Sequence, residues 1–172
     1  MKKDNRYLVK RTAIGGLLVA IMLILGYIES LLPLPTPVPG IKLGLSNGVL
    51  LFALYLLDIP FAILLMVLKV VLSSLMFSGI NTLFYALGGG VLSLALMIPL
   101  SRMKDVSIIV VSMVGAVAHN AGQIIMAILI MHMNAAAAFR TLSLLMVIGL
   151  LTGAVTGVVA KTVIGRMNNI MK

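Results

Sequence analysis

Three polar residues inside an apolar stretch, His119, Asn120 and Gln123, are the part of this sequence best suited to bind a ligand. His119 and Gln123 are four residues apart, so they share one face of a helix, with Asn120 beside them. They interrupt an apolar run from about residue 106 to residue 131. A polar group at membrane depth costs free energy unless it meets a partner, water or a ligand. The stretch therefore predicts either a binding site or hydrogen bonds between helices.

Other polar residues are expected at a similar depth. Lys69 falls near the middle of an apolar segment, where a lysine usually faces the bundle interior and marks function. With a rise of about 1.5 Å per residue, Glu29 and Lys42 fall near the outer surface and Asn47 about one turn further in. These residues and His119 can therefore share a polar pocket in the outer half. They can also serve structure alone, with a Glu29–Lys42 ion pair, a buried pair for Lys69 and a helix cap at Asn47.

The charges of this set favour an anionic ligand. Lys42, Lys69 and a titratable His119 stand against one acid, Glu29. A carboxylated or phosphorylated cofactor, or a quinone precursor, has the matching charge.

The acids of the chain are too scattered to form a metal site. Asp4, Glu29, Asp58 and Asp105 are its four acids, and no two are close in sequence. Holding magnesium against a diphosphate requires clustered carboxylates. The chain also lacks cysteine and any Gly-rich phosphate loop followed by Lys and Ser or Thr. We therefore expect no metal, no cofactor and no catalysis by this chain alone.

Apolar segments must position these residues. The chain has 172 residues, 62% hydrophobic and 10% charged, with a mean hydropathy of +1.22, whereas soluble domains are roughly 45–50% apolar and about 25% charged. This composition predicts an all-α polytopic membrane protein, with residues 1–172 as a single integral membrane domain. The second and third segments can also be taken as one bent span. The expected spans are roughly 12–32, 43–57, 60–78, 81–100, 106–131 and 140–163.

Six transmembrane helices with both termini in the cytoplasm best satisfy the positive-inside rule. Ten of the 13 basic residues then lie on the cytoplasmic side, whereas five spans leave one basic end on the wrong side. The basic ends orient the chain in the cell membrane and meet anionic lipid, so they require no nucleic-acid partner. The ten residues are Lys2, Lys3, Arg6, Lys10, Arg11, Arg102, Lys104, Lys161, Arg166 and Lys172.

The connector after the first span contains four prolines, at positions 33, 35, 37 and 39. Such a segment cannot be helical and favours an extended, stiff conformation. We expect either a rigid connector or a cap over a cavity.

Four motifs in this sequence resemble those of a known membrane family. The sequence resembles the Gx transporter family, also labelled heptaprenyl diphosphate synthase component I, which looks similar to the substrate-binding S-components of energy-coupling-factor (ECF) transporters. The resemblance implies a six-helix, ECF S-component-like bundle with a ligand site near the outer face. Lys69 departs from an arginine expected in the family, which keeps the charge but loses a bidentate contact. The motifs are Glu29-Ser30, Pro39-Gly-Ile-Lys-Leu-Gly-Leu-Ser-Asn47, Tyr85-Ala-Leu-Gly-Gly-Gly-Val-Leu-Ser93 and Gly115-Ala-Val-Ala-His-Asn-Ala-Gly-Gln123.

Two functions follow from the residues and the resemblance. The first is a substrate-binding subunit for uptake of a small anionic cofactor or precursor, energised by a separate transmembrane coupling protein and ATPase pair. The alternative is a non-catalytic accessory subunit of heptaprenyl diphosphate synthase or quinone synthesis. A stand-alone proton-coupled carrier is disfavoured because Glu29 is the only carboxylate near the membrane. The predicted substrate-binding residues are Glu29, Lys42, Asn47, Lys69, Tyr85, His119, Asn120 and Gln123.

Small residues on the first and last spans predict helix contacts. Gly149, Gly153 and Gly157 recur every four residues, a pattern that lets another helix approach closely. Either this stripe or a shorter one on the first span can dock a partner, or both can pack within the bundle. The resemblance to S-components favours the first span, with Ala13, Gly16 and Ala20 as the docking face.

Overall fold

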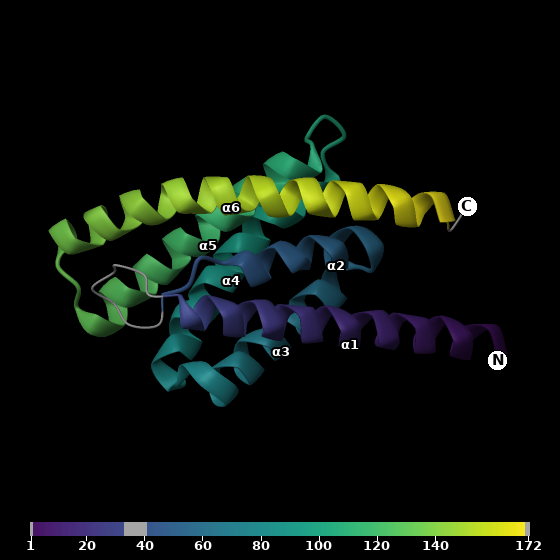
Figure 1. The fold of residues 1–172 in the computed structure, drawn as a ribbon, viewed down its shortest axis with the longest axis horizontal. Coiled ribbons are helices and arrows are strands. Elements are labelled where there is room, and N and C mark those ends of the chain that lie inside the picture. Colours follow the sequence, from purple (N-terminus) through teal and green to yellow (C-terminus); the bar gives the residue numbers. More distant parts are fainter. Residues whose placement is uncertain (1, 33–40, 171–172) are drawn as a thin grey trace.

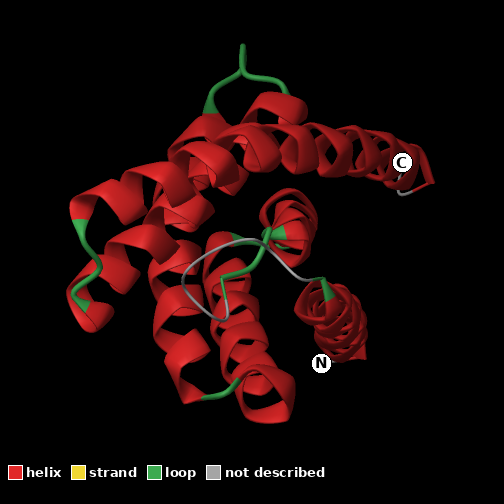
Figure 2. Cartoon of the chain, turned by 60° about the vertical axis from the view of Figure 1, so that its left-hand side comes forward, coloured by secondary structure: helices red, strands yellow, loops and turns green. Residues whose placement is uncertain are grey.

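A computed structural model describes residues 2–32 and 41–170, and the secondary structure of this part of the chain consists of helices, without strands. The helices form a single elongated bundle (Figures 1 and 2). The proline-rich connector lies outside the described residues, as do the two extreme ends of the chain. The helices are α1 (Lys2–Leu31), the 3-10 helix η1 (Leu45–Val49), α2 (Leu50–Leu56), α3 (Ile59–Ser73), the π-helix η2 (Ser74–Ser78), α4 (Ile80–Arg102), α5 (Ile108–Met131) and α6 (Ala135–Ile170).

Within the described residues, five helical segments are long and apolar enough to cross a membrane, and one of them is α3 and η2 together (Ile59–Ser78). The chain is therefore an all-α, multi-pass membrane protein. The five segments coincide with the first and the last four expected spans, although α6 runs further at both ends than 140–163. The second expected span is η1 and α2 together, a shorter apolar helix over Leu45–Leu56.

The second and third segments form a helical hairpin and not one bent span. Asp58 is in an extended conformation between α2 and α3, and its side chain caps α3 by accepting from the Phe61 amide at 2.9 Å. Lys69 on α3 donates to Asn47 on η1, so α3 runs back along the preceding helix. The turn at Asp58 and Pro60 therefore reverses the chain direction.

Close backbone contacts hold α4, α5 and α6 together. A Cβ atom added to Gly122 on α5 would lie 2.4 Å from the carbonyl oxygen of Gly88 on α4. A Cβ on Gly153 of α6 would lie 2.7 Å from the Cα atom of Met113 on α5, and the equivalent atoms on Gly149 and Gly157 would also contact α5. The glycine stripe of α6 is therefore used for packing within the bundle.

Contacts to α1 mark the two ends of the bundle. α1 begins and α6 ends at the same end, the terminal end (Figure 1). There Arg11 on α1 forms an ion pair with Asp58. At the opposite end the Leu45 amide donates to the Glu29 carboxylate. Arg11 and Glu29 are separated by about 27 Å of helix rise, so η1, α2 and the turn at Asp58 together bridge most of the length of α1.

Candidate ligand-binding site

A small buried cavity near the end opposite the termini is lined mostly by polar side chains from four helices and the segment before η1. Its volume is about 10 Å³, enough for a single water molecule. Five of the eight predicted binding residues line it, namely Glu29, Lys42, Lys69, His119 and Gln123. The structure therefore brings together residues that are up to 94 positions apart in the sequence.

Gln123 anchors the segment that leads into η1. Its side-chain Oε1 accepts from the Lys42 backbone amide at 3.0 Å, and its Nε2 donates to the Lys42 carbonyl oxygen at 3.0 Å. Gln123 is 1% exposed, so both amide groups are satisfied by one backbone position in a dry environment. This pair of bonds attaches the segment to α5 beside the cavity.

Glu29 holds the start of η1. Its carboxylate accepts from the Leu45 amide and from the Ser46 hydroxyl, the latter at 3.2 Å. Gly44 precedes these residues in the left-handed conformation, with φ of 84°. Glycine adopts that conformation without strain, so the chain can turn into η1 beside the carboxylate.

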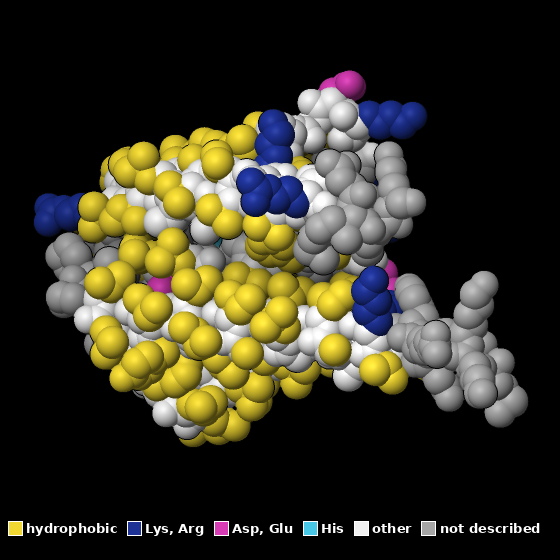
Figure 3. Space-filling view, turned by 45° about the vertical axis from the view of Figure 1, so that its right-hand side comes forward, with side chains coloured by type: hydrophobic (Ala, Val, Ile, Leu, Met, Phe, Trp, Pro, Cys, Tyr) yellow, Lys and Arg dark blue, Asp and Glu magenta, His cyan; other side chains and the backbone are white. Residues whose placement is uncertain are grey.

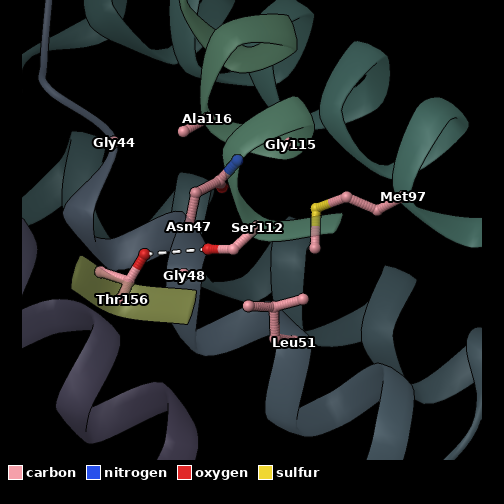
Figure 4. Close-up of a pocket in the computed structure, with 9 residues that line it drawn as sticks. All are labelled: Gly44, Asn47, Gly48, Leu51, Met97, Ser112, Gly115, Ala116 and Thr156. Atoms are coloured by element: carbon pink, nitrogen blue, oxygen red, sulfur yellow. Dashed lines mark hydrogen bonds between the residues drawn. The ribbon is translucent and has the colours of Figure 1, made fainter. Parts of the chain in front are cut away.

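Lys69 and Asn47 connect this cavity to a second one. Lys69 is buried on α3, and its Nζ donates to Asn47 Oδ1 at 3.4 Å. Asn47 Nδ2 has no hydrogen-bond partner within the described residues. Figure 4 shows the Asn47 side chain directed toward the α5 backbone, in a second cavity of about 10 Å³ that Ser112 and Thr156 also line.

His119 lies between two glycines. A Cβ added to Gly44 would be 3.0 Å from His119 Cδ2, and one added to Gly89 on α4 would be 2.6 Å from His119 Nδ1. Within the described residues, Nδ1 has no hydrogen-bond partner although the side chain is buried. The two glycines thus create the space that the imidazole occupies.

Asn120 and Tyr85, also predicted for the site, are not among the residues that line the cavity. Asn120 Nδ2 donates to the Leu145 carbonyl oxygen at 2.6 Å, which joins α5 to α6. Tyr85 is buried in an apolar cluster with Ile41 and Ile124. Asn120 therefore forms a hydrogen bond between helices, which was the alternative to a role in ligand binding.

The cavity also includes polar residues that were not predicted from the sequence. Ser73 and Thr82 line it, and Ser78 accepts from Lys42 Nζ at 2.6 Å. The Lys42 ammonium also lies 5.1 Å from the centre of the Phe77 ring, a cation–π contact. Phe77 and Ser78 belong to η2, and π-helices occur frequently at functional sites. The sequence signal was the Ser73-Ser74 and Ser78-Gly79 pairs at the end of an otherwise apolar segment.

Two charged groups outside the membrane-spanning helices have shifted pKa values. Burial lowers the pKa of the Lys42 ammonium, and the Glu29 charge partly offsets this effect. At the terminal end, the Phe61 amide and then Arg11 hold the pKa of Asp58 below its usual value.

The predicted docking residues lie on an outward face of α1. Ala13, Gly16 and Ala20 are exposed, and a Cβ atom added to Gly16 would have no neighbour within 4 Å. Gly15, in contrast, faces the Phe61 ring. The two small-residue stripes therefore differ, because that of α6 packs against α5 whereas that of α1 stays uncovered.

One comparison decides the family. The sequence profile of heptaprenyl diphosphate synthase component I matches residues 18–163, which is most of the chain. The chain belongs to this family. This match confirms the resemblance drawn from the motifs. It also agrees with the expectation that this chain is at most a non-catalytic subunit. No curated protein and no solved structure matches the chain.

Proposed function

We propose that this chain is a non-catalytic membrane subunit that binds a small anionic group in the Glu29–Gln123 cavity. The observation that carries this proposal is the charge of the cavity, which has two ammonium groups, on Lys42 and Lys69, and one carboxylate, on Glu29. Buried charges without full pairing are costly in a membrane and mark function.

The hydrogen bonds of the cavity leave donor capacity for an anion. The Glu29 oxygens already accept from Leu45 and Ser46. An ammonium group has three donors, and within the described residues Lys69 makes one hydrogen bond, to Asn47 at 3.4 Å. A phosphate or carboxylate oxygen near Lys69 would supply the stronger, charge-assisted acceptor.

The cavity must open to admit such a group. Its volume of about 10 Å³ holds one water molecule. The Lys42 side chain is held by Ser78 and Phe77, and its release would free the η2 side of the cavity. We propose that an anion competes with Ser78 for the Lys42 ammonium as it enters.

Family membership favours a role in heptaprenyl diphosphate synthesis. We propose that the cavity holds the diphosphate end of a prenyl substrate or product, while a separate catalytic chain supplies the acidic residues for magnesium. Three of the four acids of this chain support such a division, because Glu29 and the Asp58 partner Arg11 are about 27 Å apart along α1 and Asp105 lies in the 103–107 loop.

The test is native mass spectrometry of the purified chain with inorganic diphosphate, farnesyl diphosphate and farnesol. We expect both diphosphates to bind and farnesol not to bind, and Lys69→Met to abolish binding while Lys69→Arg retains it. Asn120→Ala is the matched control, since Asn120 bonds to α6 outside the cavity lining. Equal binding of farnesol and farnesyl diphosphate, or full binding by Lys69→Met, would refute the anion site.

A second candidate is a substrate-binding subunit for uptake, working with a transmembrane coupling protein and an ATPase pair. The uncovered stripe of Ala13, Gly16 and Ala20 on α1 favours it, because small exposed residues let another helix approach closely. Co-purification from gently extracted membranes distinguishes the candidates by the partner recovered, either an ATPase pair or a soluble, Asp-rich prenyltransferase. Gly16→Leu should remove a coupling protein from the preparation and leave anion binding intact.

We also propose that the chain crosses the cell membrane six times, with both termini in the cytoplasm. Two observations support an even number of crossings. α1 begins and α6 ends at one end of the bundle (Figure 1), and the segment from Leu45 to Asp58 extends between the levels of Glu29 and Arg11 on α1. The helices η1 and α2 themselves rise about 20 Å, which is about two thirds of the roughly 30 Å hydrocarbon core of a bilayer.

A further inference from the structure

An apolar groove on the outside of the bundle lies between α1 and α6, over η1 and α2. Its volume is about 410 Å³. Leu17 and Ile21 are among the residues of its α1 side, Gly48 and Phe52 form part of its floor, and Val159 contributes to its α6 side. Figure 3 shows a face of the molecule on which hydrophobic side chains follow the long helices.

The groove exists because α1 and α6 pack on other helices. α1 packs mainly on α3 and η1, and α6 packs mainly on α5, while the short helix between them forms the floor. Gly48 lets η1 pack closely against α6 at the bottom of the groove, because a Cβ atom there would lie 2.6 Å from the Thr156 Cβ atom. A lateral opening toward the lipid is the result.

The lining selects an apolar occupant. Thr156 is its one polar side chain, and the Thr156 hydroxyl already bonds to the Thr152 carbonyl at 2.8 Å and to Ser112 at 3.0 Å. The groove extends along α1 from Ile14 to Leu25, a helix rise of about 16 Å. This is about half of the roughly 30 Å hydrocarbon core, the depth of one leaflet.

Two exposed cations continue the groove at its terminal end. Lys10 lies four residues before Ile14 on α1, and Arg166 lies three residues after Val163 on α6, so each occupies the groove-lining face of its helix. Asp58, the acid in the turn between α2 and α3, is already paired with Arg11. The groove therefore combines an apolar channel one leaflet deep with positive charge at the level of the lipid headgroups.

From this combination we infer that the α1–α6 groove is a binding site for an anionic phospholipid, with one acyl chain in the groove and the phosphate between Lys10 and Arg166. The lipid belongs to the leaflet beside the termini, where basic pockets between helices attract anionic headgroups. A partner's transmembrane helix fits these observations less well, because it would extend over both leaflets. This site is separate from the Glu29–Gln123 cavity, so it holds whether or not that cavity binds an anion.

The first test compares headgroups. The full chain in mild detergent is equilibrated with phosphatidylglycerol or with phosphatidylcholine of the same acyl chains, and retained lipid is counted by native mass spectrometry. We expect one phosphatidylglycerol to be retained preferentially. The double variant Lys10→Gln, Arg166→Gln should weaken its retention by about thirtyfold, whereas the matched double variant Arg102→Gln, Lys104→Gln should not. Equal retention of both lipids, or equal effects of both double variants, would overturn the site.

The second test fills the groove. Val158 and Val159 are neighbours on α6 with 52% and 53% exposure, and of the two only Val159 lines the groove. Val159→Trp should displace the lipid, and Val158→Trp should leave it bound. If both tryptophan variants retain the lipid, the lipid assignment is wrong. It is also wrong if a photo-crosslinking amino acid at position 159 captures a partner protein in membranes.

Discussion

At the scale of single residues, some buried polar side chains hydrogen-bond to the backbone of another segment, and others have polar atoms without a hydrogen-bond partner. Gln123 and Glu29 hold the backbone of Lys42 and Leu45, so they fix the segment that enters η1. Asn47 Nδ2 and His119 Nδ1, in contrast, are buried without partners among the described residues. Unpaired buried groups are costly, and binding a ligand is one way to satisfy them.

Replacing Glu29 by glutamine tests how much its carboxylate stabilises the start of η1. The variant keeps the shape of the side chain but loses a charged acceptor for the Leu45 amide and leaves Lys42 and Lys69 without a facing carboxylate. We expect a loss of about 2 kcal/mol in unfolding free energy, measured by thermal or denaturant unfolding in detergent. Ser46→Ala removes only the 3.2 Å bond and should have a smaller effect. A Glu29→Gln variant as stable as the wild type would contradict this account.

The pKa of Asp58 predicts an acid-dependent loss of stability. Because this pKa is below its usual value of 3.8 in the folded chain, ionised Asp58 favours folding above about that pH. The contribution is lost as pH falls through the lowered folded pKa. Asp58→Asn keeps an oxygen that can accept from the Phe61 amide, so it serves as the matched variant. The melting temperature of the wild type should exceed that of Asp58→Asn at neutral pH, and the two should converge in strong acid. A difference that is independent of pH would contradict the prediction.

At the scale of helices, the two small-residue stripes have opposite surroundings. Gly153 on α6 approaches the backbone of α5, whereas Gly16 on α1 faces no neighbour. The sequence pattern is similar in both, so only packing separates a contact within the bundle from an exposed face.

Leucine at these two glycines should give different outcomes. At Gly153 even a Cβ atom would come within 2.7 Å of the Met113 Cα atom, so α6 must move away from α5. We expect a loss of about 1–3 kcal/mol or more from overpacking, seen as a lower melting temperature and less monodisperse protein. Gly16→Leu should fold with a stability close to that of the wild type. Equal stability of both variants would mean that α6 does not depend on this close contact.

At the scale of the whole molecule, the apolar groove extends from Leu25 and Leu45, beside the candidate cavity, toward the terminal end of the bundle, and the two sites share no lining residue. The cavity is beside Glu29, and the cations that continue the groove are on the terminal side of Ile14 and Val163. In the proposed orientation the cavity is near the outer surface and the groove opens to the cytoplasmic leaflet. A small-molecule ligand and a lipid can then bind without competing.

Cysteine labelling tests the six crossings, since the chain has no cysteine of its own. Pro60→Cys, Ser107→Cys and Asn134→Cys each introduce one thiol at an exposed position in a turn or at its edge. A membrane-impermeant maleimide added to intact cells should label Asn134→Cys alone, and all three after permeabilisation. Labelling of Pro60→Cys in intact cells would show that the Leu45–Leu56 segment does not cross the membrane.

The sequence alone determined the class of the protein and the polar residues that gather in its interior. A chain this apolar must be a membrane bundle, and its few polar residues avoid lipid, so Glu29, Lys42, Lys69, His119 and Gln123 face one another. Their depths followed from the helix rise of about 1.5 Å per residue.

Only the tertiary structure decided how each helix is rotated. Lipid-facing and core-facing positions are both apolar in a membrane, so the sequence pattern carries little information about rotation. For this reason the direction of Asn120 toward α6, the burial of Tyr85 among apolar residues, and the contributions of Ser73 and Thr82 to the cavity were not predictable. The apolar groove was equally hidden, because it depends on α1 and α6 packing against other helices across a short one.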